Sequence, residues 1–204
     1  VKALRHNMDL IRQSRHSEAV AQGTHVVKLS NLQKSINALP ESGQDTLALN
    51  DSVEYKQMNQ DWRVRILCEK LAQSSVAILE LAGVGAADDF AQALAELVLP
   101  HSKHLREVNL GRNAIGTTGV VALATALPQS QIQVLRLNNQ KTSSGAEAQI
   151  ALVNAASACE TLTKLNFDWK QATHRSNCER ALMQNADRAR KRRLAERNRD
   201  SGVS

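Results

Sequence analysis

The chain has 204 residues, a formal net charge of +6 and an isoelectric point near 9.5, and aromatic residues make up only 2% of it. This length favours one domain with a continuous core over two separate domains. No apolar run reaches the roughly 18 residues of a membrane span and no signal peptide is evident, so we expect a cytoplasmic protein. The three cysteines, Cys68, Cys159 and Cys178, lack C-x-x-C spacing, which indicates free thiols rather than disulfides or a zinc site.

The first part of the chain is predicted to hold a helix, a strand and a long loop. Residues 1–22 carry loosely periodic apolar residues and are expected to form an N-terminal capping helix. An imperfect first strand is expected at residues 25–32. Residues 38–59 contain Pro40 and several polar turn formers, so we interpret them as an inserted loop. A helix at about 60–73 then restores a regular apolar pattern.

One unit is repeated along the rest of the chain. Apolar residues recur in the pattern L-x-x-L-x-L, with starts separated by 105−76 = 29, 132−105 = 27 and 162−132 = 30 residues. The four clear openings are Val76-x-x-Leu79-x-Leu81, Leu105-x-x-Val108-x-Leu110, Ile132-x-x-Leu135-x-Leu137 and Leu162-x-x-Leu165-x-Phe167. Apolar residues three or four apart follow, as expected of a helix. This is the signature of a leucine-rich repeat.

We therefore expect an α/β fold, a short right-handed leucine-rich-repeat solenoid of the ribonuclease-inhibitor type, with a parallel sheet backed by helices. No repeat buries its apolar side alone, so neighbours stack and the end repeats need caps. The repeats are assigned to residues 23–173, between the capping helix at 1–22 and a second one at 174–198, with a tail at 199–204. Asn113 is expected to be a turn residue whose amide satisfies backbone groups between stacked units.

The C-terminal segment differs in charge from the rest of the chain. Residues 174–204 hold nine basic and four acidic residues, so 9−4 = +5 of the net charge lies there. Leu182, Met183 and Leu194 fall at helical spacing among the charged positions. We expect these three side chains to hold the helix on the last repeat, while its basic face stays in water.

Catalytic and metal-binding interpretations are weak. His101 and His104 have H-x-x-H spacing but no third ligand nearby in the sequence. The pair Asp88 and Asp89 is explained by the positive end of a helix dipole. Cys178 lies close to arginines that lower a thiol pKa, yet no His and acid constellation accompanies it. We expect no enzyme activity, no metal and no cofactor.

The C-terminal helix carries a distinctive resemblance. The segments Leu182-Met183-Gln184-Asn185-Ala186-Asp187 and Arg190-Lys191-Arg192-Arg193-Leu194-Ala195 resemble the terminal helix of the tropomodulin and leiomodin family. Residues 135–140 and 165–169 resemble that family's penultimate and last strands, and the resemblance covers about residues 19–197. Two features depart from it. The insertion at 38–59 is not part of the pattern, and the family's N-terminal half, which binds tropomyosin and supplies a first actin-binding segment, has no counterpart in this chain.

The resemblance implies an actin-binding domain of a cytoskeletal protein that caps filament pointed ends. Arg190, Lys191, Arg192 and Arg193 are the candidate contacts to acidic groups on actin. The alternatives are a generic protein-interaction scaffold and a polybasic module for nucleic acid or anionic surfaces. Nucleic acid is disfavoured because stacking aromatics are nearly absent and the body of the chain is close to neutral. We expect a monomer.

Overall fold

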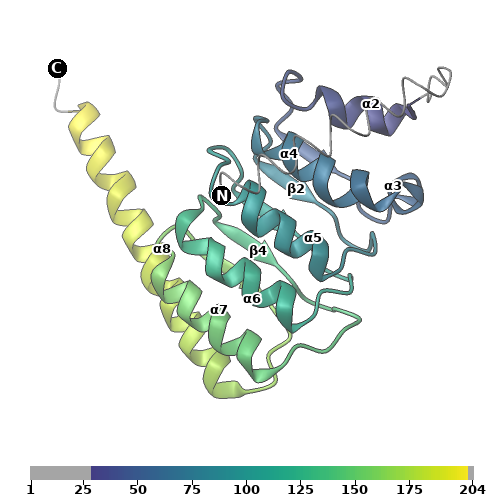
Figure 1. Cartoon of the computed structure of the whole chain (residues 1–204). Helices are drawn as coiled ribbons and strands as arrows, with labels where there is room; N and C mark the ends of the chain where they lie inside the picture. Colours follow the sequence, from purple (N-terminus) through teal and green to yellow (C-terminus); the bar gives the residue numbers. More distant parts are fainter. Residues whose placement is uncertain (1–28, 202–204) are drawn as a thin grey trace, which may run out of the picture. The chain divides into compact units, whose positions relative to one another are not determined.

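The computed structural model describes residues 29–201. The chain divides into residues 1–31 and 32–204, and the second unit is the repeat domain. The predicted helix at 1–22 lies outside the described residues. Figure 1 shows the domain as a curved stack in which strands line one side and helices the other.

Five short parallel strands form one sheet in the order β1-β2-β3-β4-β5 within the described residues (Figure 1). The strands are β1 (Thr46–Ala48), β2 (Ile78–Glu80), β3 (Glu107–Asn109), β4 (Val134–Arg136) and β5 (Lys164–Asn166). The middle residue of each strand aligns with the next one, which brings Leu47, Leu79, Val108, Leu135 and Leu165 into one row. The predicted parallel sheet is confirmed.

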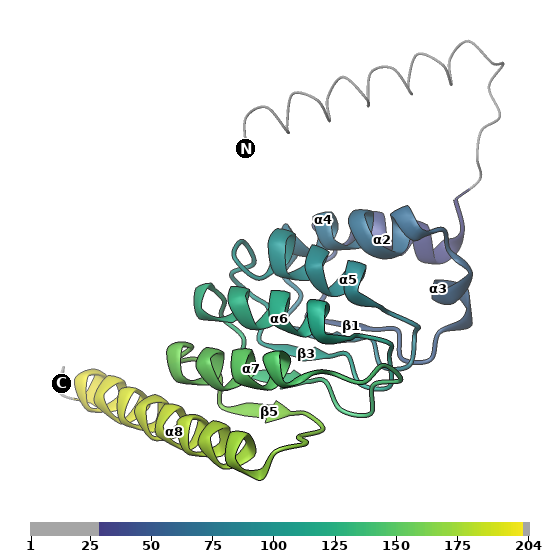
Figure 2. The ribbon, with the colours of Figure 1, turned by 60° about the horizontal axis from the view of Figure 1, so that its bottom comes forward.

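Helical segments connect the strands and cover one face of the sheet (Figure 2). They are α2 (Asn31–Ala38), α3 (Val53–Gln57), η1 (Trp62–Ile66), α4 (Leu67–Ala72), α5 (Asp88–Ala93), η2 (Leu94–Val98), α6 (Thr117–Ala126), η3 (Leu127–Gln129), α7 (Ala146–Ala158) and α8 (Ala172–Ser201). The core lies between the two layers. The side chains of Leu79, Leu81, Leu94 and Leu110 are 0% exposed, because each repeat supplies inward apolar residues to a layer that its neighbours close.

The predicted insertion at residues 38–59 is wrong, and half of the predicted first strand at residues 25–32 lies outside the described residues. Residue Asn31 begins α2, so the described part of the segment 25–32 contains no strand. Residues 38–59 are the first repeat with a described strand, since they contain β1 and α3. Its opening carries Gln44 where the other repeats carry an apolar residue, and this substitution hid the pattern. Leu47 and Tyr55 of this segment are 6% and 1% exposed, so they belong to the core.

The amide of Asn113 joins two neighbouring repeats, as predicted. Its Oδ1 accepts hydrogen bonds from the backbone N–H groups of Gly85 and Ala86, at 2.9 and 3.1 Å. Its Nδ2 donates to the carbonyl oxygens of Leu81 and Leu110, at 2.8 and 3.0 Å. The side chain is fully buried. Four backbone N–H and C=O groups in these turns, which the strand ladder does not reach, thereby gain hydrogen-bond partners.

Helix α8 closes the C-terminal end of the stack by packing along α7 (Figure 2). Cys178, Ala181, Leu182 and Asn185 are its buried residues. Asn185 Nδ2 lies 2.9 Å from each of three carbonyl oxygens at the end of the last repeat, those of residues 156, 159 and 162. The helix therefore acts as a cap.

The prediction that Met183 and Leu194 also anchor α8 is wrong. These side chains are 63% and 48% exposed, whereas that of Leu182 is 9% exposed. Starting from Cys178, the residues of α8 that face the repeats follow one another at intervals of three or four. Neither Met183 nor Leu194 falls in this series.

Candidate functional site

The second half of α8 lies beyond the apolar cap and is exposed. The buried face runs through Cys178, Leu182 and Asn185 and continues, at the same helical spacing, into the half-buried Ala189. The next positions on this face are Arg192 and Glu196. Residues 190–199 are all exposed. Charged side chains stand where an apolar contact would need Leu or Ala, so this part of the helix stays in water.

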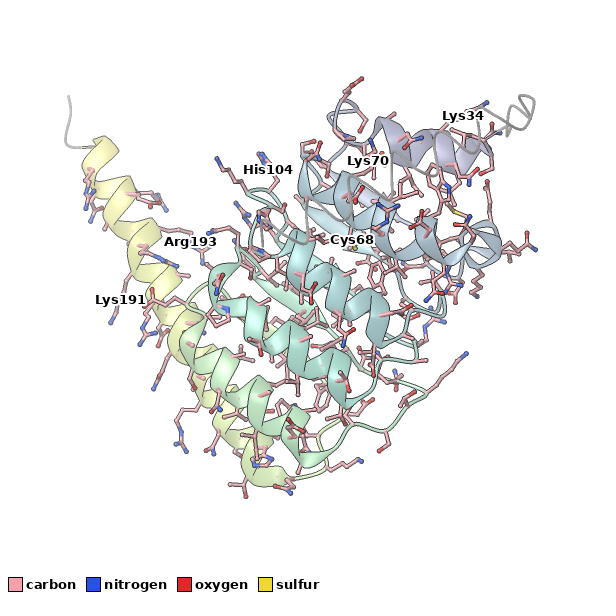
Figure 3. All side chains as sticks on the ribbon, in the orientation of Figure 1. Lys34, Cys68, Lys70, His104, Lys191 and Arg193 are labelled. Carbon is pink, nitrogen blue, oxygen red and sulfur yellow. The ribbon has the colours of Figure 1, made fainter. Side chains whose placement is uncertain are left out.

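The four predicted contact residues do not all line the same cavity. Arg192 and Arg193 line a cavity of about 380 Å³ together with Ala189 and Glu196, against Gln133, Thr161 and Thr163 at the entry to β4 and β5. Arg190 and Lys191 do not line this cavity. Figure 3 shows Lys191 and Arg193 on opposite sides of the helix. Only part of the basic run therefore faces this cavity.

Few of the basic side chains of α8 form ion pairs with carboxylates of the repeats. Arg188 lies 3.9 Å from Glu160, and both side chains are more than half exposed. Arg193 Nε donates to the carbonyl oxygen of Ala189 at 3.4 Å, within the helix. Among the residues that the structure describes, no carboxylate forms an ion pair with Arg190, Lys191 or Arg192.

The concave face of the sheet carries a self-satisfied polar network. Arg136 lies 3.5 Å from Glu80 and 3.4 Å from Glu107. Glu80 also accepts hydrogen bonds from the side-chain amides of Asn109, at 2.6 Å, and Asn50, at 3.2 Å. In the structure these groups bind one another, so the network braces adjacent strands.

The other polar residues singled out in the sequence have structural partners. Asp88 Oδ1 accepts a hydrogen bond from the backbone N–H of Gly116 at 2.6 Å, so it links two repeats in addition to lying at a helix start. Burial raises the pKa of Cys178 to about 11, which is opposite to the lowering expected from nearby arginines. His101 and His104 are exposed. Within residues 29–201 no group of three or more His, Cys, Asp or Glu side chains is arranged to hold a metal.

Comparison with known proteins assigns the family. A family model described as the TMOD/LMOD leucine-rich domain matches residues 31–188. The chain belongs to this tropomodulin and leiomodin family. The match spans the repeats from α2 to the docked half of α8, and it includes the segment 38–59 that sequence reasoning set apart as an insertion. The assignment agrees with a binding domain rather than an enzyme.

Individual relatives support the same family. Human leiomodin-2 is 29% identical over 128 residues, which cover 62% of this chain and 23% of that protein. The chain thus spans about a quarter of that relative's length. The solved structure of Leiomodin-1 Actin-Binding Site 2 (ABS2) superposes with a TM-score of 0.78 at 24% identity, covering 85% of this chain and 99% of that one. The Caenorhabditis elegans tropomodulin C-terminal domain gives a TM-score of 0.72 at 23% identity, covering 81% and 99%.

The chain therefore has nearly the whole fold of these two solved domains. In the part of the chain that the structure describes, every helix is too short or too polar to cross a membrane. Sequence reasoning found the basic run of α8 but missed that only Arg192 and Arg193 of this run face the cavity. The spacing 178, 182, 185, 189, 192, 196 contains that signal, because it marks which positions face the body.

Proposed function

We propose that this chain binds actin and contributes to capping the pointed end of actin filaments. Membership of the tropomodulin and leiomodin family carries the proposal. The superposed leiomodin-1 domain is an actin-binding site, and the present chain has the same architecture. The protein acts in the cytoskeleton by recognition and carries out no chemical reaction.

In this proposal the exposed half of α8 supplies the contact and the repeats supply the frame. Residues 190–193 present three guanidinium groups and one ammonium group on a helix whose first half is fixed to the last repeat. Guanidinium groups bind carboxylates through two parallel hydrogen bonds, so Arg suits an acidic protein surface. A helix held by Leu182 and Asn185 keeps these groups in place, which reduces the entropy lost on binding.

A polybasic module for nucleic acid is the second candidate, favoured only by the same cations. A nucleic-acid site without sequence preference combines a basic groove with stacking aromatic residues. The side chains that accompany Arg192 and Arg193 in their cavity are Gln, Thr, Ala and Glu. These surroundings favour a protein partner.

The deciding experiment measures elongation from pointed ends of filaments whose barbed ends are blocked. Wild-type chain is compared with a variant in which residues 190–193 are all Glu. A matched control reverses four exposed lysines on the repeats, which leaves the total charge change the same. These lysines are Lys34, Lys56, Lys103 and Lys141.

We expect inhibition by the wild-type chain and by the control, and at least tenfold weaker inhibition by the helix variant, since contacts between exposed charges steer and orient binding. Inhibition should saturate with the number of ends rather than with total actin, and added salt should weaken it. Binding along filament sides only, or none at low salt, contradicts the proposal. Equal losses in the variant and the control would show that net charge, rather than α8, determines binding.

A further inference from the structure

The sheet ends at β5 with an unpaired edge. In the described residues β5 pairs with β4 and with no further strand. The carbonyl of Asn166 accepts a hydrogen bond from Leu137 and the N–H of Lys164 binds Gln133, both on the β4 side. Because bonds alternate along a parallel strand, the N–H and C=O of Leu165 and the N–H of Phe167 point to the other edge. Figure 2 shows α8 across the end of the stack, next to both α7 and β5. Because α8 is a helix, it forms no strand ladder with β5, and these backbone groups have no strand partner among the described residues.

Apolar side chains at this edge are incompletely covered. Leu165 and Phe167 are half-buried, whereas Leu135 and Leu137, the aligned residues on β4, are 2% and 0% exposed. Helix α8 crosses the end of the last repeat but does not bury the side chains of Leu165 and Phe167 fully. Leu165 and Phe167 are not isolated apolar residues on the surface, because they continue the core of the domain.

Two cavities lie along the crease between this strand segment and α8. The first, of about 380 Å³, is lined at the start of the segment by Thr161 and Thr163 and on the helix by Arg192 and Arg193. The second, of about 560 Å³, is lined at the other end by residues 165–169 and on the helix by Arg175 and Glu179. Phe167 and Trp169 stack edge to face in its wall, with ring centroids 5.0 Å apart. The same two segments line both cavities, and we call the crease between these segments the groove.

The charges along the groove select its occupant. At one end Arg192, Arg193 and Glu196 line the groove and Lys164 is exposed on the strand itself, so three cations accompany one carboxylate there. At the other end Arg175 is paired with Glu179 at 2.8 Å. A lysine on a short edge strand opposes pairing with a second basic edge. The same lysine attracts an acidic strand.

We propose that the groove between the β5 edge and α8 binds an extended acidic segment of a partner protein, which adds to the sheet as a sixth strand. Its backbone pairs with Leu165 and Phe167, its apolar side chains cover the end of the core beside Trp169, and its carboxylates meet Arg192 and Arg193. Strand addition supplies affinity through the main chain and specificity through alternate side chains. The proposal is independent of whether the partner is actin.

The test uses a blocked ten-residue peptide with three glutamates followed by alternating valine and threonine. Binding is followed by the fluorescence of Trp169 in a Trp62→Phe background, and the pairing by amide hydrogen exchange at Leu165 and Phe167. We expect saturable binding and slowed exchange at both amides. A peptide with lysines in place of the glutamates, and one with N-methylated valines, should each bind at least tenfold more weakly.

Two double variants with the same charge change separate the groove from the helix as a whole. Arg192→Glu with Arg193→Glu should weaken the peptide at least tenfold, because these side chains line the groove, whereas Arg190→Glu with Lys191→Glu should change affinity less than threefold. Equal losses in the two variants, unchanged exchange at Leu165 and Phe167, or no binding of the peptide would overturn the proposal. Tighter binding of single-stranded DNA or anionic vesicles at the same two arginines would overturn it as well.

Discussion

Asp51 and Arg112 form an ion pair of 2.7 Å although 61 residues separate them in the chain. The pair passes over Gly83 of the intervening repeat. All three residues have a left-handed backbone, with φ of 56°, 67° and 57° in chain order, so successive repeats turn at the same place. A Cβ on Gly83 would lie 2.2 Å from Asp51 Oδ1. The missing side chain in the middle repeat therefore allows the two outer repeats to meet.

Replacing Gly83 by Ala should lower the free energy of unfolding by about 1–2 kcal/mol, because a left-handed non-glycine residue is strained and the new methyl group displaces Asp51. Asp51→Ala alone should cost less than about 1 kcal/mol, since both partners of the ion pair are half exposed. Urea unfolding of the two single variants and of their combination measures both effects. If Gly83→Ala becomes neutral in the Asp51→Ala background, the clash and not the backbone is the cause.

Replacing Asn113 by Ala should cost about 2–4 kcal/mol, because four buried backbone groups lose their partner at once. Asn113→Asp keeps the acceptor but loses the two donated bonds, and we expect a loss of similar size. Asn154, an exposed residue of α7, is the control, and its change to Ala should be neutral or slightly stabilising in a helix. Thermal unfolding of the three variants gives the comparison. A neutral Asn113→Ala would mean that water replaces the amide.

The C-terminal cap is tested by two leucines on one helix. Leu182→Asp should destabilise the domain by at least about 3 kcal/mol or cause aggregation, because it places a charge in a buried apolar contact. Leu194→Asp should change stability by less than about 0.5 kcal/mol, because that side chain is 48% exposed. The midpoint of thermal unfolding distinguishes them. Equal effects would indicate that the distal half of α8 docks as well.

Stability should fall as the pH rises above about 9. Burial raises the pKa of Cys178 to about 11, from an ordinary value of 9.0, and raises those of Cys68 and Tyr55 further. Between these values the unfolded chain releases protons that the folded chain keeps, so ionisation favours unfolding, whereas below pH 9 this stability is fully present. Urea unfolding at pH 8 and pH 10.5 measures the loss, which should be smaller in Cys178→Ala. An identical loss in that variant would assign the effect to the other buried groups.

Local pattern was sufficient for the four regular repeats and for the turn at Asn113. An L-x-x-L-x-L opening has one compact solution, in which inward side chains stack on those of the next repeat, and it needs no information from distant parts of the chain. The first described repeat escaped detection because Gln44 replaces an apolar residue there and Pro40 and Gly43 resemble loop signals. Leu47 and Tyr55 reveal it only through their burial.

The sequence by itself determined the repeat fold, the terminal basic helix and the family resemblance, since each depends on residue spacing along one segment. Only the tertiary structure decided how α8 is used. Whether Leu182, Met183 or Leu194 docks depends on which side of the helix meets the last repeat. This contact joins α8 to segments more than twenty residues away in the chain. The hydrogen bonds from Asn185 to residues 156, 159 and 162 are an example. The same contact places Arg192 and Arg193, but not Arg190 and Lys191, in the wall of the cavity beside the β5 segment. Because α8 is a helix, it leaves the outer edge of β5 without a ladder partner among the described residues.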